Sequence, residues 1–158
     1  MQYFINNSKV LTAQNNLIKI LDDNKFSYII LKGLSSASFY PDPKKRLLGD
    51  VDFLICPEQQ KAVEDALINA GYKKELDEHI CHRVFKKPHE HLEMHFEVAG
   101  IPHGKAGELF RDFLKNATQK FEEHETPSFK KPLPKFHCVI IFLHTIHHLL
   151  GEGLGLRH

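Results

Sequence analysis

Two aspartates, Asp50 and Asp52, stand two residues apart at the beginning of an apolar segment. In a β-strand, side chains alternate between the two faces, so both carboxylates would point the same way, with Cα atoms roughly 6.5–7 Å apart. Val51, Phe53 and Ile55 would then point to the opposite face, into a core. Two neighbouring acids repel each other unless a positive charge lies between them. The pair therefore suggests a divalent cation and metal-assisted chemistry.

A second segment, Lys32-Gly33-Leu34-Ser35-Ser36, follows an apolar run and has the residue types of a phosphate-binding turn. Glycine lets the backbone approach a ligand closely, and the start of the following helix offers free N–H groups and the positive end of the helix dipole. The hydroxyl groups of Ser35 and Ser36 can add donors. Either motif alone is more often structural, as a solvated strand start or a serine-capped turn.

Length and composition limit the class of protein. The 158 residues are enough for one domain with a hydrophobic core, and the net charge of +1 does not indicate a nucleic-acid-binding surface. Three widely spaced cysteines predict reduced thiols. The sequence shows neither the pattern of a signal peptide nor an apolar run that could span a bilayer. We therefore expect a cytoplasmic protein that makes no membrane contact.

Apolar periodicity predicts the elements that would position the two motifs. Ser8 would cap the first helix, and Pro127, Pro132 and Pro134 predict an irregular segment before the last helix. The predicted helices cover residues 9–23, 34–39, 57–70, 108–116 and 136–150, and the predicted strands cover residues 26–31, 50–55, 72–76, 82–86 and 91–98. Residues 151–158 have the composition of a linker, and the sequence leaves open whether a further helical segment follows them.

In this order the motifs resemble the nucleotidyltransferase superfamily of the DNA polymerase β type, and within it a family of uncharacterised bacterial-type nucleotidyltransferases. The resemblance covers residues 31–158 in separate blocks, of which the Asp-X-Asp block is the most specific. Leu34 stands where the wider superfamily has a serine after the glycine. The matching blocks are Leu31-Lys32-Gly33, Tyr40-Pro41-Asp42-Pro43, Arg46, Gly49 to Ile55, Glu93-Met94-His95-Phe96, and the histidine-rich helix with its Gly-Leu-Arg segment, His144 to Arg157.

The resemblance implies an α/β (α+β) fold of the polymerase β-like type, a small mixed sheet flanked by helices. Residues 1–126 would form the nucleotidyltransferase core domain. Residues 127–158 would form a helical segment, and whether it is the start of a longer C-terminal helical region stays open.

The resemblance also implies an enzyme that moves a nucleoside monophosphate from a nucleoside triphosphate to an acceptor hydroxyl with Mg²⁺, or alternatively Mn²⁺. The acceptor class stays open among protein, sugar, small molecule and nucleic acid. By this resemblance Asp50 and Asp52 are the first two catalytic, metal-binding carboxylates. Glu93 is our choice for the third, because it faces away from the core side of its strand. Glu97, two residues further along the predicted strand, is the backup.

Nucleotide and phosphate contacts would come from basic and small residues around these acids. Lys32 and Arg46 could contact the triphosphate, with exposed surface charge as the alternative. His95 could orient a phosphate or act as a base, or serve as a structural histidine. The expected set is Lys32, Gly33, Ser35, Ser36, Arg46 and His95.

Two other functions remain open from the sequence. One is a catalytically degenerate module of the same fold that binds nucleotide or protein, expected if Glu93 and Glu97 lie far from the aspartates. The other is a histidine-rich metal-binding protein. His144, His147 and His148 share one helix at spacings that can hold zinc or iron. Four more histidines lack recognisable ligand spacing: His79, His82, His89 and His91.

Overall fold

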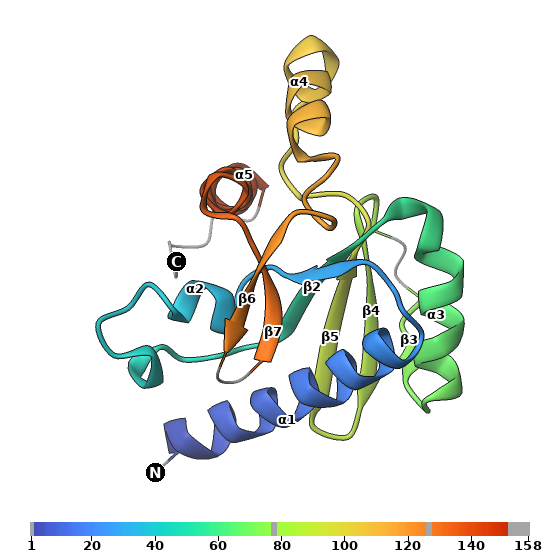
Figure 1. Ribbon diagram of the computed structural model, residues 1–158, viewed down its shortest axis with the longest axis vertical. Helices are drawn as coiled ribbons and strands as arrows, with labels where there is room; N and C mark the ends of the chain where they lie inside the picture. The colour runs from blue at the N-terminus through green and yellow to red at the C-terminus, as the bar shows by residue number, and fades with distance from the viewer. Residues whose placement is uncertain (1, 77–78, 126–127, 152–158) are drawn as a thin grey trace.

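The computed structural model describes residues 2–76, 79–125 and 128–151 (Figure 1). Within the described part of the chain, none of the helices combines the length and the apolarity that crossing a bilayer requires. In chain order the elements are α1 (Gln2–Asp23), β1 (Tyr28–Ile30), α2 (Leu34–Ala37), η1 (Pro43–Lys45), β2 (Val51–Ile55), η2 (Pro57–Gln59), α3 (Gln60–Asn69), β3 (Lys73–Lys74), β4 (His82–Lys87), β5 (Glu90–His95), α4 (Gly104–Leu114), β6 (Phe121–Glu125), β7 (Ser128–Pro132) and α5 (Pro134–Gly151).

The main sheet has five strands in the order β1-β2-β5-β4-β3. Strands β2 and β5 run parallel, whereas the other neighbours are antiparallel, so the sheet is mixed. The parallel register sets Asp52 beside Glu93, and the antiparallel register of β4 and β5 sets His82 beside His95. This architecture confirms the predicted α+β fold with a small mixed sheet.

Alternating residues of β1 and β2 enter two different hydrophobic clusters, one on each face of the sheet. Tyr28 and Phe53 belong to the first cluster, to which α1 and α3 contribute. Ile29 and Leu54 belong to the second cluster, to which α5 and the end of α4 contribute. Figure 1 shows α1 and α5 on opposite sides of the strands.

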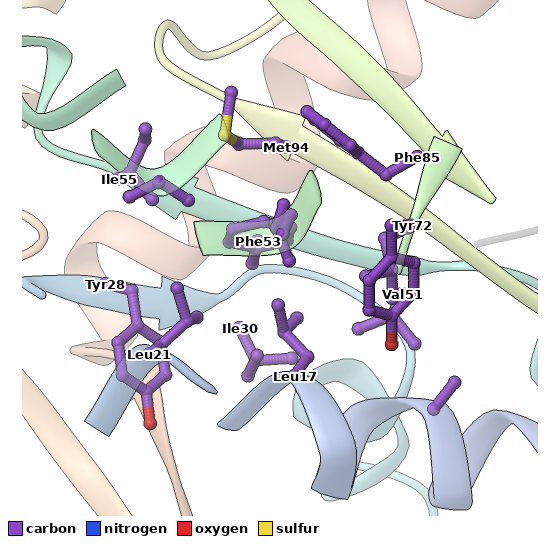
Figure 2. Close-up of a cluster of buried hydrophobic side chains, with 14 of the residues drawn as sticks. Leu17, Leu21, Tyr28, Ile30, Val51, Phe53, Ile55, Tyr72, Phe85 and Met94 are labelled. Atoms are coloured by element: carbon purple, nitrogen blue, oxygen red, sulfur yellow. The ribbon is translucent and has the colours of Figure 1, made fainter. Parts of the chain in front are cut away.

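The first cluster contains the large side chains that the alternation of β2 and β5 predicts (Figure 2). Burying one such side chain contributes roughly 1.5–3 kcal/mol, so this face carries much of the stability of the fold. Its fully buried members include Leu17, Leu21, Tyr28, Ile30, Phe53, Ile55, Leu67, Phe85, Leu92 and Met94.

Burial on both faces was not predicted for β2. All five of its residues are buried, because the second cluster covers the face that carries Leu54 and Asp52. Ile140 and Leu143 of α5 belong to that cluster. Asp52 is therefore buried, whereas Asp50 and Glu93 on the same side are half-buried.

The predicted start of the first helix is wrong. Helix α1 begins at Gln2, so Ser8 lies inside it and does not cap it. No glycine or proline precedes Ser8 to end a helix. The early turns are also tied to the chain after η1, because Asn7 Nδ2 donates to the Arg46 carbonyl at 3.0 Å and the Leu48 N–H donates to Asn7 Oδ1 at 3.0 Å.

The predicted irregular segment before the last helix is instead a β-hairpin of β6 and β7. Charged residues dominate β6, so its sequence shows little strand periodicity. Phe129 of β7 is buried in the first cluster, which fixes the hairpin against the sheet. Pro132 is the last residue of β7, where a proline is tolerated at a strand end.

The predicted strand over residues 91–98 ends early, at His95. The N–H groups of Phe96 and Glu97 donate to the Cys81 carbonyl at 3.1 and 3.4 Å, which turns the chain out of the strand. Val98 consequently packs in the second cluster and not with Met94 in the first. The alternation that was expected to place Glu97 beside Glu93 does not continue that far.

Candidate active site

Three carboxylates converge where β2 begins beside β5. One oxygen of Asp50, one of Asp52 and one of Glu93 all lie within 4.8 Å of one another. The register pairs Asp52 with Glu93 across the parallel strands, and Asp50 directly precedes β2. Sequence reasoning selected these three residues, and the structure brings them together.

Asp52 is the most deeply placed acid, with 2 % of its surface exposed. Its Oδ1 atom lies 2.8 Å from Lys32 Nζ and 3.1 Å from His95 Nε2. The backbone supports this arrangement, because the Leu31 N–H donates to the Asp52 carbonyl at 2.9 Å and so holds Lys32 at the site. His95 Nε2 also lies 3.6 Å from Glu93 Oε2.

The charges of these groups are strongly interdependent. Burial, together with the charges of Asp52 and Glu93, raises the pKa of Asp50 to about 7. Burial opposes ionisation of Asp52 as well, but the Lys32 ammonium and His95 hold its pKa well below the usual range. Burial disfavours a charged His95, yet its hydrogen bond to Asp52 raises the pKa of the ring to about 10.

The donor set fits a hard divalent cation. Lys32 and His95 balance Asp52 and Glu93, whereas ionisation of Asp50 adds a third negative charge that these two cations do not offset. Oxygen ligands from a few carboxylates, completed by water and substrate phosphates, are the environment that Mg²⁺ prefers. Asp50, Asp52 and Glu93 are therefore a group that could hold a divalent cation.

The turn at Gly33 lies next to this group. Gly33 has φ 62° and ψ −116°, and its carbonyl accepts a hydrogen bond of 3.2 Å from Arg46 Nη1. The two serines differ, since Ser35 is fully buried whereas Ser36 is half-buried, with its Oγ 3.3 Å from His137 Nε2. The structure thus brings Arg46 to the turn and leaves Ser36 as the more accessible hydroxyl.

Helix α5 contributes a side chain that the sequence analysis did not assign to this site. His144 Nε2 accepts a hydrogen bond from Lys32 Nζ at 2.9 Å, and His148 Nε2 lies 2.7 Å from the same ring nitrogen. In the described part of the chain, His144, His147 and His148 do not belong to any group of side chains arranged to hold a metal ion. Helical spacing revealed that two of them are neighbours, but it could not show that one faces Lys32.

Two further acid and histidine positions differ from expectation. Glu97, the backup ligand, forms an ion pair with Arg111 of α4, because β5 ends before it. His82, which the sequence left without a role, forms a potential ligand group with Glu93 and His95. His82 lies here because the register of β4 and β5 pairs it with His95. The sequence could have predicted this contact only if the pairing of β4 with β5 had been known.

Comparison with known proteins agrees with this geometry. Residues 2–158 match the sequence model of a family described as uncharacterised nucleotidyltransferase. No significant match exists to a curated protein or to a solved structure. The match spans essentially the whole chain, including both motifs and the carboxylate strands, and the chain therefore belongs to this nucleotidyltransferase family.

Proposed function

We propose that this chain transfers a nucleoside monophosphate from a nucleoside triphosphate to an acceptor hydroxyl, with Asp50, Asp52 and Glu93 holding Mg²⁺. The observation that carries the proposal is the convergence of these three carboxylates within 4.8 Å. Membership of the nucleotidyltransferase family supports the reaction class. In this reaction the acceptor oxygen bonds to the α-phosphorus, and the bond to the pyrophosphate leaving group breaks.

The basic residues around the carboxylates would serve the triphosphate. When bound, Mg²⁺ would supply positive charge to the phosphates and make the acceptor hydroxyl easier to deprotonate. Lys32 now neutralises Asp52, and its flexible ammonium could turn toward a phosphate once Asp52 has another cation. Arg46 at the Gly33 turn would be a second phosphate contact, with Ser36 adding a hydroxyl. His95 would hold Asp52 in its ionised form.

A neighbouring cavity offers room for the rest of the nucleotide. It has a volume of about 450 Å³, within the range of small-molecule sites, and Ser36 and Arg46 are among the residues that line it. Phe39 and Tyr40 also line it and are 63 % and 40 % exposed, so their rings are available for stacking on a base. We propose that the base lies here while the triphosphate points toward the carboxylates.

The degenerate binding module would have been favoured if Glu93 and Glu97 both lay far from the aspartates. Glu93 lies beside them, an observation that favours the enzyme over that alternative. The histidine-rich metal protein rested on the trio of α5. The contact of His144 with Lys32 instead supports a role for that helix in positioning the lysine.

The double variant Asp50→Asn/Asp52→Asn tests the proposal directly. It keeps the side-chain shapes but removes two of the three negative charges at the site. We expect the Mg²⁺-dependent affinity for a non-hydrolysable nucleoside triphosphate to fall at least about tenfold, which corresponds to about 1.4 kcal/mol. Titration calorimetry with and without Mg²⁺ measures this change.

A matched control is Asp65→Asn/Asp112→Asn, because both of these aspartates form exposed ion pairs with a lysine three or four residues away. Its affinity should equal that of the unaltered protein. Far-UV circular dichroism checks that both double variants are folded. Equal affinity of the two folded double variants would overturn the assignment of the metal site.

A further inference from the structure

A second group of potential metal ligands lies at the start of β4. His79, Cys81 and His82 each offer one ligand atom, and these atoms lie within 4.8 Å of one another. Cys81 is buried, whereas the two histidines are half-buried. The group therefore has a protected thiol and two rings that an ion from solvent could reach.

The separations between these atoms suit a tetrahedral ion. Zn–S bonds of about 2.3 Å and Zn–N bonds of about 2.0–2.1 Å place the two ligand atoms ~3.5 Å apart at a tetrahedral angle. Cys81 Sγ lies 3.2 Å from His79 Nδ1 and 3.8 Å from His82 Nδ1. A thiolate with two imidazoles is a donor set for zinc, in contrast to the all-oxygen carboxylate site.

The backbone that carries these ligands is held in place. Arg83 Nη1 donates to the carbonyl groups of His79 and His82, the latter at 2.8 Å. The N–H groups of Phe96 and Glu97 donate to the Cys81 carbonyl. A ligand set whose backbone is already positioned loses less conformational entropy when it binds an ion.

We propose that His79, Cys81 and His82 bind one Zn²⁺ ion, at a site that adjoins the three carboxylates through His82 and Glu93 but shares no ligand with them. Zinc with three protein ligands takes a fourth. Here a water molecule would be the fourth ligand. The ion would fix the start of β4, where His82 lies beside His95 with ring centroids 5.2 Å apart.

The test uses the full chain, purified under reducing conditions and loaded with Zn²⁺ or Co²⁺. We expect one equivalent of zinc by elemental analysis, and a sulfur-to-cobalt charge-transfer band in the near ultraviolet with Co²⁺. Cys81→Ser should abolish that band. It should also weaken Zn²⁺ affinity, measured by chelator competition, by about 100-fold or more, since even the loss of an outer-shell partner costs about 10–100-fold. His79→Ala, on a half-buried position, should weaken Zn²⁺ affinity as well and serves if the cysteine variant does not fold.

Matched controls are Cys138→Ser, at an exposed free thiol, and His103→Ala, at an exposed position before α4. Both should bind Zn²⁺ like the unaltered protein. Asp50→Asn/Asp52→Asn should also keep its zinc, so this result is independent of the proposed reaction. Absence of stoichiometric zinc, or a charge-transfer band of equal intensity in Cys81→Ser, would overturn the proposal.

Discussion

At the scale of single residues, Lys32 connects the acids to the last helix. Its ammonium lies 2.8 Å from Asp52 Oδ1 and 2.9 Å from His144 Nε2, and its side chain is only 12 % exposed. A buried ion pair contributes little net stability compared with apolar residues, but breaking it leaves a buried charge without its partner. Lys32 would therefore both balance the charge of Asp52 and bind the triphosphate.

Replacing Lys32 with methionine should destabilise the protein by about 3 kcal/mol in the absence of divalent cations, because Asp52 loses a cationic partner. Adding Mg²⁺ should raise the urea midpoint of Lys32→Met more than that of the unaltered protein, since the ion would supply the missing charge. Urea unfolding followed by circular dichroism, with and without Mg²⁺, measures both effects.

The matched variant is Lys45→Met, because Lys45 forms an ion pair with Asp42 at 3.8 Å and is 82 % exposed. Exposed pairs of this kind contribute about 0–1 kcal/mol. The charge-balance role of Lys32 is wrong if the two lysine variants are equally stable and respond equally to Mg²⁺.

At the scale of elements, the site depends on how α5 approaches the chain after β5. Gly100 has a φ of 85°, and a Cβ atom built there would lie 2.2 Å from the Leu143 carbonyl oxygen and 3.1 Å from the His147 Cβ atom. Only glycine permits both this backbone conformation and this close approach. His144, which contacts Lys32, follows Leu143 on the same helix.

Gly100→Ala should therefore destabilise the protein by roughly 3 kcal/mol or more, since backbone strain and a displaced helix act together. Thermal unfolding followed by far-UV circular dichroism measures this loss. Gly49→Ala is the control, because no atom beyond its two chain neighbours lies within 4 Å of a Cβ built at Gly49. A Gly100→Ala variant as stable as Gly49→Ala would show that α5 does not need this close approach.

At the scale of the whole molecule, the second cluster joins the predicted core domain to the helical segment after residue 126. Leu54 of β2 and Ile140 of α5 belong to the same cluster, and Ile140 is only 2 % exposed. The boundary between residues 126 and 127 stays a prediction. Shared burial indicates that the described part of the helical segment unfolds together with the sheet.

Ile140→Ala should lower the free energy of unfolding by about 2–5 kcal/mol. Tyr28 and Tyr72 are buried in the first cluster and contribute to the near-UV circular dichroism signal. The unfolding midpoint measured from that signal should fall by the same amount as the midpoint measured from the far-UV signal of the helices. Leu109→Ala, at a position of α4 that is 74 % exposed, is the control. If the two midpoints moved by different amounts, the protein would not unfold as one cooperative unit.

The sequence alone determined those features that depend on residues close together along the chain, namely strand alternation and short motifs. The apolar alternation of β2 placed Val51, Phe53 and Ile55 in a core, and the structure confirms it. The Asp-X-Asp block and the Lys-Gly turn carried the resemblance that predicted the family and its carboxylates. Strand periodicity predicted which side chains share a face, and so favoured Glu93 as the third acid. Charge-rich β6 was missed, since its residues carry little periodic signal.

Only the tertiary structure decided which residues of other strands and helices contact the acids and Lys32. The parallel register pairs Asp52 with Glu93 and leaves Glu97 to Arg111, and the packing of α5 brings His144 to Lys32. Packing also buries Asp52 and His95. Burial and the neighbouring acids raise the pKa of Asp50, whereas the hydrogen bond to Asp52 raises the pKa of His95. Strand order and helix docking join residues far apart along the chain, and such contacts depend on how the whole molecule buries its apolar surface.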